Sequence, residues 1–209
     1  MKVRLISHSS TPTGENLVDQ VAYCARVSNP SNQMNKETNE KLLRYLMKHQ
    51  HWSPFEMVSV CMEITTTRDI ARQILRHRSF SFQEFSQRYA KVDNKFELRD
   101  ARLQDLYNRQ NSIPVEGTEL DTRWKIKQQE LIVQVHKTYN WALESGIAKE
   151  QARAILPEGN TWSRLYMNGT LRSWLHYIQL RQANGTQLEH MEVAKECGRV
   201  LSEIFPLEE

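Results

Sequence analysis

The chain has 209 residues, of which 25% are charged and 39% are hydrophobic, and its formal net charge is +3. This length suits one domain with a substantial core, or a compact domain with insertions. The basic excess is too mild for a protein that coats nucleic acid, but it suits a local pocket for a small anion. No apolar run approaches the roughly 20 residues of a membrane span, and the N-terminus lacks the apolar segment of a signal peptide.

Cysteine and glycine usage exclude several kinds of site. Cys24, Cys61 and Cys197 are isolated and form no Cys-x-x-Cys pair, so neither a disulfide framework nor a zinc ribbon is expected. The glycines are scattered, and no Gly-x-Gly-x-x-Gly or Walker loop can be assembled from them. We therefore expect a cytoplasmic protein without a metal site, in which side chains and ordinary helix ends hold any nucleotide or flavin.

The first fifty residues predict a strand and two helices. Residues 2–8 alternate as a strand, with Val3 and Leu5 on one side. Residues 16–25 predict a short helix that ends in the turn Ala25-Arg26-Val27-Ser28-Asn29-Pro30. Residues 35–50 predict an amphipathic helix whose inward positions are Leu42, Leu43, Tyr45 and Leu46.

The segment His51-Trp52-Ser53-Pro54-Phe55-Glu56 follows that helix and admits two interpretations. Ser53, then proline, then Glu56 three positions after the serine, has the spacing of a capping box. Exposed amides and hydroxyls at such a helix start can also receive a cofactor phosphate. The residues alone leave both interpretations open.

A strand and a basic helix come next. Residues 58–66 are rich in β-branched side chains and predict a central strand. Residues 67–75 predict a helix with an apolar stripe. Arg68, Arg72 and Arg76 recur every four residues, so the helix would stack them on one face.

The stretch 76–89 is the densest in chemically versatile side chains. After Arg78 the pattern changes to period two, which would place Glu84, Ser86 and Arg88 on one side of an extended segment. A helix end that continues into such a strand can bind a flat, polar, anionic ligand. The planar guanidinium group can donate two parallel hydrogen bonds to phosphate oxygens. The alternative is a solvated basic helix followed by an edge strand.

The remaining chain predicts mostly helices. Residues 93–115 are polar and predict an irregular, variable excursion with little catalytic content. Residues 120–145 predict the longest helix, which ends at Gly146. A short helix is expected at 149–156 and an extended segment at 161–166, and two further helices are expected at 171–182 and 187–204. The apolar positions of the longest helix are Trp124, Leu131, Val135, Tyr139 and Ala142.

Several motifs, in this order along the chain, resemble those of the flavin-dependent thymidylate synthases. The central one is Arg76-His77-Arg78, seven residues and then Ser86, closing in Ser86-Gln87-Arg88-Tyr89. The flanking ones are His51-x-Ser53-Pro54-Phe55-Glu56, Ala152-Arg153-x-x-Leu156-Pro157, Asn168-x-x-x-Arg172 and Leu180-Arg181. The resemblance runs from about residue 25 to about residue 190, with gaps between 93 and 120.

This resemblance implies an α/β (α+β) fold, with an antiparallel sheet flanked by helices in a single domain, residues 1–209. It also implies a homotetramer with active sites at subunit junctions, and neither nucleic acid nor membrane as a partner. The implied reaction converts dUMP to dTMP, with methylenetetrahydrofolate as carbon donor, NADPH as reductant and FAD as hydride carrier. Arg181 would act catalytically, beside the uracil carbonyl, by stabilising charge on the ring without an enzyme nucleophile.

The resemblance carries further roles onto matching positions. The residues implied at the flavin are Ser28, His51, Ser53, Glu56, Arg76, His77, Arg78, Asn168, Arg172 and His176. Those implied at the nucleotide are Gln73, Arg76, Glu84, Ser86, Gln87, Arg88, Arg153 and Arg181. The chain departs from the common family pattern at Met57, Gln83 and His176, and the spacing from Asn168 to Arg172 is longer than usual.

Two other classes of protein fit parts of the pattern. A nucleic-acid-binding module would use the arginines of stretch 76–89 with Phe80, Phe82 and Phe85 as stacking platforms, and would bind with steep salt dependence. A flavoprotein acting on a different acceptor would bind FAD and oxidise NADPH indifferently to dUMP. A bound flavin chromophore distinguishes the two flavoproteins from the nucleic-acid-binding module. Dependence of NADPH oxidation on dUMP distinguishes the synthase from the flavoprotein with another acceptor.

Overall fold

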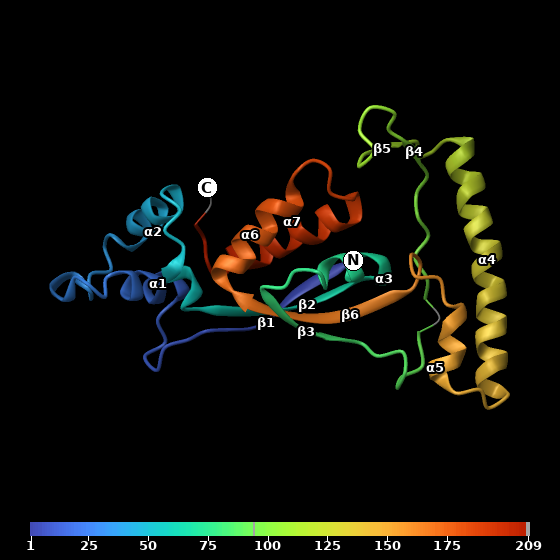
Figure 1. The fold of residues 1–209 in the computed structure, drawn as a ribbon, viewed down its shortest axis with the longest axis horizontal. Coiled ribbons are helices and arrows are strands. Elements are labelled where there is room, and N and C mark those ends of the chain that lie inside the picture. The colour runs from blue at the N-terminus through green and yellow to red at the C-terminus, as the bar shows by residue number, and fades with distance from the viewer. Residues whose placement is uncertain (94, 208–209) are drawn as a thin grey trace.

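A computed structural model describes residues 1–93 and 95–207. Its centre is a four-stranded antiparallel sheet with strand order β1-β2-β6-β3 (Figure 1). The strands are β1 (Lys2–His8), β2 (Ser59–Thr67), β3 (Phe80–Glu84) and β6 (Trp162–Thr170). A separate hairpin is formed by β4 (Arg102–Gln104) and β5 (Ser112–Pro114).

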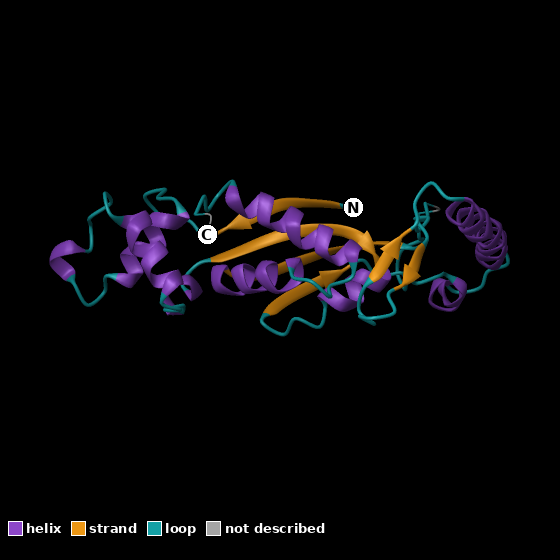
Figure 2. Ribbon diagram, turned by 90° about the horizontal axis from the view of Figure 1, so that it is seen from above, coloured by secondary structure: helices purple, strands orange, loops and turns teal. Residues whose placement is uncertain are grey.

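Helices cover one face of the sheet and extend the molecule at both ends (Figures 1 and 2). Over the face lie α3 (Arg68–Ile74), α6 (Leu171–Gln182) and α7 (Leu188–Ser202). At one end lie α1 (Leu17–Ala25) and α2 (Asn39–Lys48), and at the other α4 (Glu119–Glu144) and α5 (Lys149–Ala152). Short 3-10 turns are η1 (Pro30–Asn32), η2 (Ser53–Glu56) and η3 (Arg153–Ile155). None of the helices in the described ranges has the length and apolar character needed to cross a membrane.

Side-chain alternation along β6 explains why only one face of the sheet is covered. Leu165 and Met167 are fully buried under the helices, whereas Arg164, Tyr166 and Asn168 are exposed on the opposite face. Successive strand residues point to opposite faces, so this pattern gives the sheet an apolar face and a polar face. We call the polar side the open face.

The covered face is fixed at the β6–α6 junction. The Thr170 hydroxyl caps α6 by accepting a hydrogen bond from the Ser173 amide at 3.2 Å. Trp174, one turn later, is fully buried, and its indole N–H donates to the Val60 carbonyl at 2.9 Å. Helix α6 thus begins directly after the central strand β6 and is hydrogen-bonded to the neighbouring strand β2. These two constraints fix the position of its later turns above the sheet.

Most expected elements are confirmed. The strand at 2–8, the helix at 171–182 and the strand at 58–66 occur within one residue of their expected bounds. The long helix is also confirmed, but two of its expected core positions, Trp124 and Leu131, are 46% and 55% exposed. These side chains face outward because α4 packs against little besides α5 and the loop before it.

Three local expectations are wrong. The helix expected at 35–50 begins only at Asn39, and Tyr45, expected inside, is 54% exposed. Of the two interpretations left open at Ser53, the capping box does not form, and the Glu56 carboxylate is bonded to Arg172.

The other two concern the middle of the chain. The extended segment expected through residue 89 ends at Glu84, where a turn begins in which the Tyr89 amide donates to the Ser86 carbonyl at 3.2 Å. The excursion at 93–115 is not irregular throughout, because it contains the β4–β5 hairpin.

Candidate functional site

Many of the side chains implied at a site fall, together with their bonded partners, into three groups. The first, which we call the central cluster, comprises Gln73, His77, Tyr177, Arg181 and His190, contributed by α3, the turn after it, α6 and α7. The second lies between η2 and the start of α6. The third, the end cluster, comprises Ser86, Gln87, Arg88, Glu150 and Arg153 near α5.

Arg181 in the central cluster is held by a histidine. Its Nε donates to His77 Nε2 at 2.9 Å, so the imidazole accepts at that nitrogen. Burial, reinforced by the Arg181 charge, lowers the pKa of His77 from 6.5 to about 4. His77 is therefore neutral at pH 7 with its proton on Nδ1. The two terminal nitrogens of the Arg181 guanidinium have no hydrogen-bond acceptor among the residues that the structure describes.

Gln73 is fixed by a second set of bonds in the same cluster. Its Nε2 donates to Gln187 Oε1 at 2.7 Å, and its Oε1 lies 3.1 Å from His190 Nδ1. His190 is fully buried, and its Nε2 lies 3.1 Å from the Tyr177 hydroxyl. The His77 ring meets Tyr177 edge-on at 4.9 Å, which joins the two sets.

The group between η2 and α6 contains an ion pair and a ring contact. Arg172 donates to the Glu56 carboxylate, and His176, one turn further along α6, meets the Trp52 ring edge-on at 4.5 Å. Burial and the nearby Arg172 charge lower the pKa of His176. His51 and Ser53, implied at the flavin, are exposed beside this group.

The end cluster is more open to water. Arg88 Nε donates to the Glu150 carboxylate at 2.9 Å, and Arg153 Nε donates to the Glu150 backbone carbonyl at 3.3 Å. Ser86 accepts from the Arg88 amide at 3.4 Å. Gln87 differs, because it is 4% exposed and its buried Nε2 donor has no hydrogen-bond acceptor among the described residues. An unsatisfied buried donor costs roughly 1–3 kcal/mol, so an acceptor placed at this position would be stabilising.

Glu84 lies between the central and end clusters. Its carboxylate accepts from Ser163 at 2.9 Å and pairs with Arg68 and Arg72 at 3.5 Å each. The predicted stacking of arginines on one helix face is thus realised for Arg68 and Arg72, which also share Glu158. In this structure the Glu84 carboxylate is therefore engaged by three side chains.

Four implied residues stand apart. Arg76 and Arg78 are exposed, and within the described ranges neither guanidinium has an ion pair or hydrogen bond. Ser28 is exposed in the turn after α1, and Asn168 lies on the open face of the sheet. A single chain therefore does not bring all the implied residues into one pocket.

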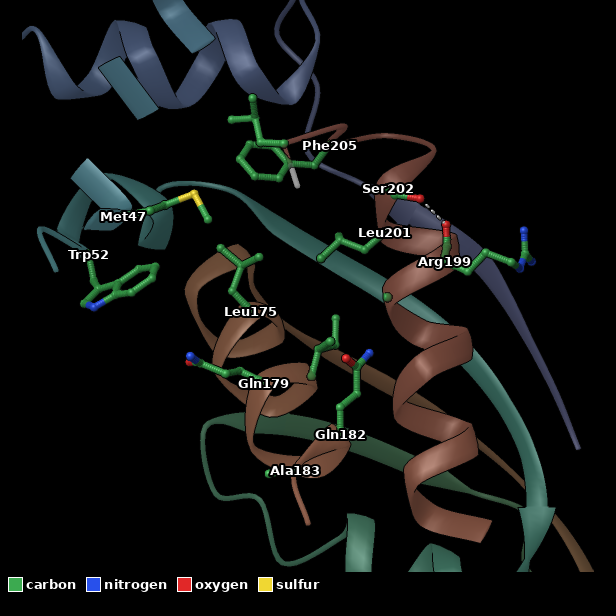
Figure 3. A pocket seen from close by; sticks show the side chains of 13 residues that line it. Met47, Trp52, Leu175, Gln179, Gln182, Ala183, Arg199, Leu201, Ser202 and Phe205 are labelled. Atoms are coloured by element: carbon green, nitrogen blue, oxygen red, sulfur yellow. Dashed lines mark hydrogen bonds between the residues drawn. The ribbon is translucent and has the colours of Figure 1, made fainter. Parts of the chain in front are cut away.

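A cavity of about 700 Å³ lies between α6, α7 and the C-terminal segment (Figure 3). Leu175, Leu201 and Phe205 supply much of its apolar wall, and Gln179 and Gln182 point along its rim. Its one cation, Arg199, is already bonded to Glu196 and Glu203. This cavity is poorly suited to a phosphate and is separate from the central cluster.

The sequence motifs did not include several residues that fix the site side chains through hydrogen bonds. His190 is a buried partner of Gln73, Tyr177 is a buried partner of His190, and Glu189 joins them through Gln187. Arg99 and Arg102, from the excursion expected to have little catalytic content, bind Glu189. The one available signal was the presence of Gln187 and Glu189 near a helix start, since no local pattern marks a buried histidine.

Comparison with known proteins identifies the family of this chain. The family described as Thymidylate synthase complementing protein matches residues 4–207. The chain is 48% identical over 208 residues to a probable flavin-dependent thymidylate synthase of Paramecium bursaria Chlorella virus 1, covering 99% of this chain and 96% of that protein. It is 49% identical over 187 residues to the flavin-dependent thymidylate synthase of Synechocystis sp., covering 89% and 85%.

A solved structure shares the fold. The UMP/dUMP methylase PolB from Streptomyces cacaoi, bound with 5-Br dUMP, superposes with a TM-score of 0.81 at 27% identity, covering 97% of this chain and 90% of that one. The fold is that of an α/β enzyme with an antiparallel sheet flanked by helices. The chain belongs to the flavin-dependent thymidylate synthase family and is an enzyme of that methyltransferase class, as the motifs predicted.

Proposed function

We propose that this enzyme converts dUMP to dTMP, with methylenetetrahydrofolate as carbon donor, NADPH as reductant and FAD as the hydride-carrying cofactor. The observation that carries the proposal is the placement of Arg181: a cation on the last turn of α6, bonded through Nε to a neutral His77, with its terminal nitrogens free of other partners among the described residues. Such a group can meet a carbonyl oxygen on which negative charge develops.

The end cluster fits the phosphate of a nucleotide. Arg88 and Arg153 bring two guanidinium groups around Glu150, and Gln87 offers a buried donor that lacks an acceptor. Phosphate oxygens satisfy such donors with charge-assisted bonds. We assign Ser86, Gln87, Arg88 and Arg153 to the phosphate side, and Gln73, Glu84 and Arg181 to the base side of the nucleotide.

The donor set also fits a flavin dinucleotide. Arg76 and Arg78 are exposed cations without partners in the described ranges, and Arg172 and His176 lie beside η2. Guanidinium groups suit a pyrophosphate, and imidazole and hydroxyl groups suit the polar edge of a ring. Bound there, FAD would supply the hydride chemistry that no side chain of this protein can supply.

The chain's own residues then have limited tasks. Arg181 binds the uracil carbonyl and stabilises charge on the ring, which makes ring carbon C5 more nucleophilic. His77 holds the Arg181 side chain in place, since its low pKa keeps it an acceptor at working pH. Ser86 binds and does not attack, because no histidine or other base contacts its hydroxyl among the described residues.

We further propose that the enzyme works as a homotetramer with active sites at subunit junctions. Ser28, Asn168 and the end cluster lie apart from the central cluster in one chain, so a second chain must contribute for these residues to meet. Two surfaces are suited to association: the open face of the sheet, and the outer side of α4. Large exposed apolar residues on α4 are Leu120, Trp124, Ile126, Leu131, Val133 and Trp141.

Tritium release from C5 of labelled dUMP tests the proposal. Purified protein is mixed with FAD, NADPH and methylenetetrahydrofolate, and the Arg181→Ala variant is run beside it with Arg109→Ala as a surface-arginine control. We expect flavin-dependent release that falls by about two orders of magnitude in Arg181→Ala and is unchanged in Arg109→Ala. Absence of release from folded, flavin-bound protein would exclude the synthase activity and leave a flavoprotein with another acceptor.

A further inference from the structure

A chain of hydrogen bonds connects the central cluster to the polar excursion after β3. It runs from Tyr177 through His190, Gln73 and Gln187 to Glu189. Each link is short: 3.1, 3.1, 2.7 and 2.9 Å in that order. The far end, Glu189, is bound by Arg102 at 2.7 Å and by Arg99 at 3.1 Å.

The carboxylate at this far end determines which way every bond points. Burial alone would raise the pKa of Glu189, but the bonds from Arg102 and Gln187 and the Arg99 charge outweigh it, and the pKa is lowered. An ionised carboxylate can only accept. Gln187 must therefore donate through Nε2 to Glu189, which leaves its Oε1 as the acceptor for Gln73 Nε2.

The same reasoning determines the donors and acceptors in the other half of this chain of hydrogen bonds, from Gln73 to Tyr177. With its amide nitrogen directed to Gln187, Gln73 presents Oε1 to His190, so His190 Nδ1 must carry the proton. Burial, with the Arg181 charge, lowers the pKa of His190 to about 3, so the ring is neutral and its Nε2 must accept. Tyr177 then donates, and its own raised pKa keeps the hydroxyl protonated.

We infer that Glu189 and His190 are positioning residues for Gln73, and that Arg99 and Arg102 fix Glu189 so that the Gln73 amide holds one orientation before a nucleotide binds. In that orientation one N–H of the Gln73 amide is engaged by Gln187 and the second has no partner among the described residues. The part of this inference that concerns the nucleotide rests on the proposed function, because Gln73 is assigned to dUMP there. The direction of the hydrogen bonds does not depend on the proposed function.

The direction is tested by NMR on protein labelled with nitrogen-15 at histidine. Long-range proton–nitrogen correlation spectra distinguish the two neutral tautomers and the charged form, and the signal of His190 is identified by its loss in His190→Asn. At pH 7 we expect His190 with its proton on Nδ1. A proton on Nε2, or a charged ring, would overturn the inference. So would an unchanged tautomer in Glu189→Gln, in which the side chain can donate as well as accept.

Nucleotide binding is tested with matched variants. Glu189→Gln removes the carboxylate that sets the direction, and Glu192→Gln removes an exposed carboxylate from the same helix. We expect Glu189→Gln to raise KM for dUMP by about tenfold, with a smaller change in kcat, because one uncharged hydrogen bond to the nucleotide is lost. Glu192→Gln should match the wild type. Equal effects of the two variants would overturn the inference.

Substitutions of His190 separate positioning from folding. Asparagine keeps a donor near the place of Nδ1, whereas glutamine places its amide near Nε2 and loses the donor to Gln73. Among variants that retain wild-type circular dichroism, we expect His190→Asn to keep KM within about threefold and His190→Gln to raise it like Glu189→Gln. Equal KM values for both would show a structural role only. If wild-type protein does not bind dUMP while His190 has the expected tautomer, the proposed function fails and the directed chain stands.

Discussion

The central cluster and the end cluster each contain arginine that we assign to the nucleotide, but they hold it differently. In the central cluster the Arg181 Nε bond goes to a half-buried neutral imidazole, and the neighbouring polar groups are buried and paired. In the end cluster Arg88 and Glu150 form a pair whose side chains are 58% and 45% exposed. The first geometry is set by the fold, and the second can rearrange when a ligand arrives, because exposed pairs contribute little to stability.

The largest expected effect comes from replacing arginine by lysine in each cluster. Lysine keeps the charge but cannot donate to His77 and present a fork to a ligand at the same time. We expect Arg181→Lys to lower kcat for tritium release by about 100-fold. Arg88→Lys should change KM by less than about tenfold, because a point charge in a solvated cluster suffices for phosphate. Equal losses in the two variants would show that the clusters do not differ in rigidity.

Packing beneath the central cluster gives the next effect. A Cβ at Gly169 would lie 2.4 Å from Cδ1 of Phe80, whose ring packs against Trp174 and Tyr177. Gly169→Ala is expected to lower the free energy of unfolding by about 2 to 3 kcal/mol through overpacking. At Gly159 a Cβ would meet only Asp69 Oδ2 at 3.9 Å, an ordinary contact, so Gly159→Ala is the control. Urea denaturation of both variants makes the comparison, and similar midpoints would contradict it.

Acid should weaken the central cluster through its buried histidine. The pKa of His190 falls from 6.5 to about 3 on folding, so the unfolded chain binds more protons between these values and stability is lost as the pH falls through that window. Between pH 7 and pH 5 this amounts to about 2 kcal/mol. His190→Asn should therefore lose about 2 kcal/mol less than the wild type over that range. Parallel pH dependence in urea titrations of the two proteins would contradict the burial of a neutral ring.

The smallest effect belongs to the exposed pair of the end cluster. Glu150→Gln removes the partner of Arg88, and we expect the free energy of unfolding to change by less than about 0.5 kcal/mol. Affinity for phosphate should rise, since Arg88 is released for the ligand. Titration with dUMP by calorimetry measures this, and weaker binding would mean that Glu150 orients Arg88 for the nucleotide.

The sequence predicts those features of the fold that depend on interactions between residues close together in the chain. It does not predict those that depend on contacts between distant residues. Strands and helices with clear periodicity, such as the strand at 58–66 and the helix at 171–182, are confirmed because local patterns decide them. Tyr45 and Trp124 were expected inside because their helices have apolar stripes. The stripe shows that a helix can be buried on one face, but not how much of its length finds a partner.

The candidate site shows the same limit. Arg76, Arg78 and Arg181 could be identified because they belong to motifs with fixed spacing. The residues that hold the site could not, because Glu189 and Arg102 lie 87 positions apart and meet only in the folded chain. The two interpretations of Ser53 could not be separated for the same reason, since the partner of Glu56 is Arg172, 116 positions away along the chain.

The order in which the strands pair has a consequence for biosynthesis. In the centre of the sheet β2 pairs with β6, and the whole segment 68–161 lies between them along the chain. Closing so long a loop is slow, and the covered face cannot form until β6, α6 and α7 have left the ribosome. Nascent chains that stop before residue 162 should remain sensitive to protease throughout. Protection from protease should appear only once the segment that forms β6, α6 and α7 has emerged.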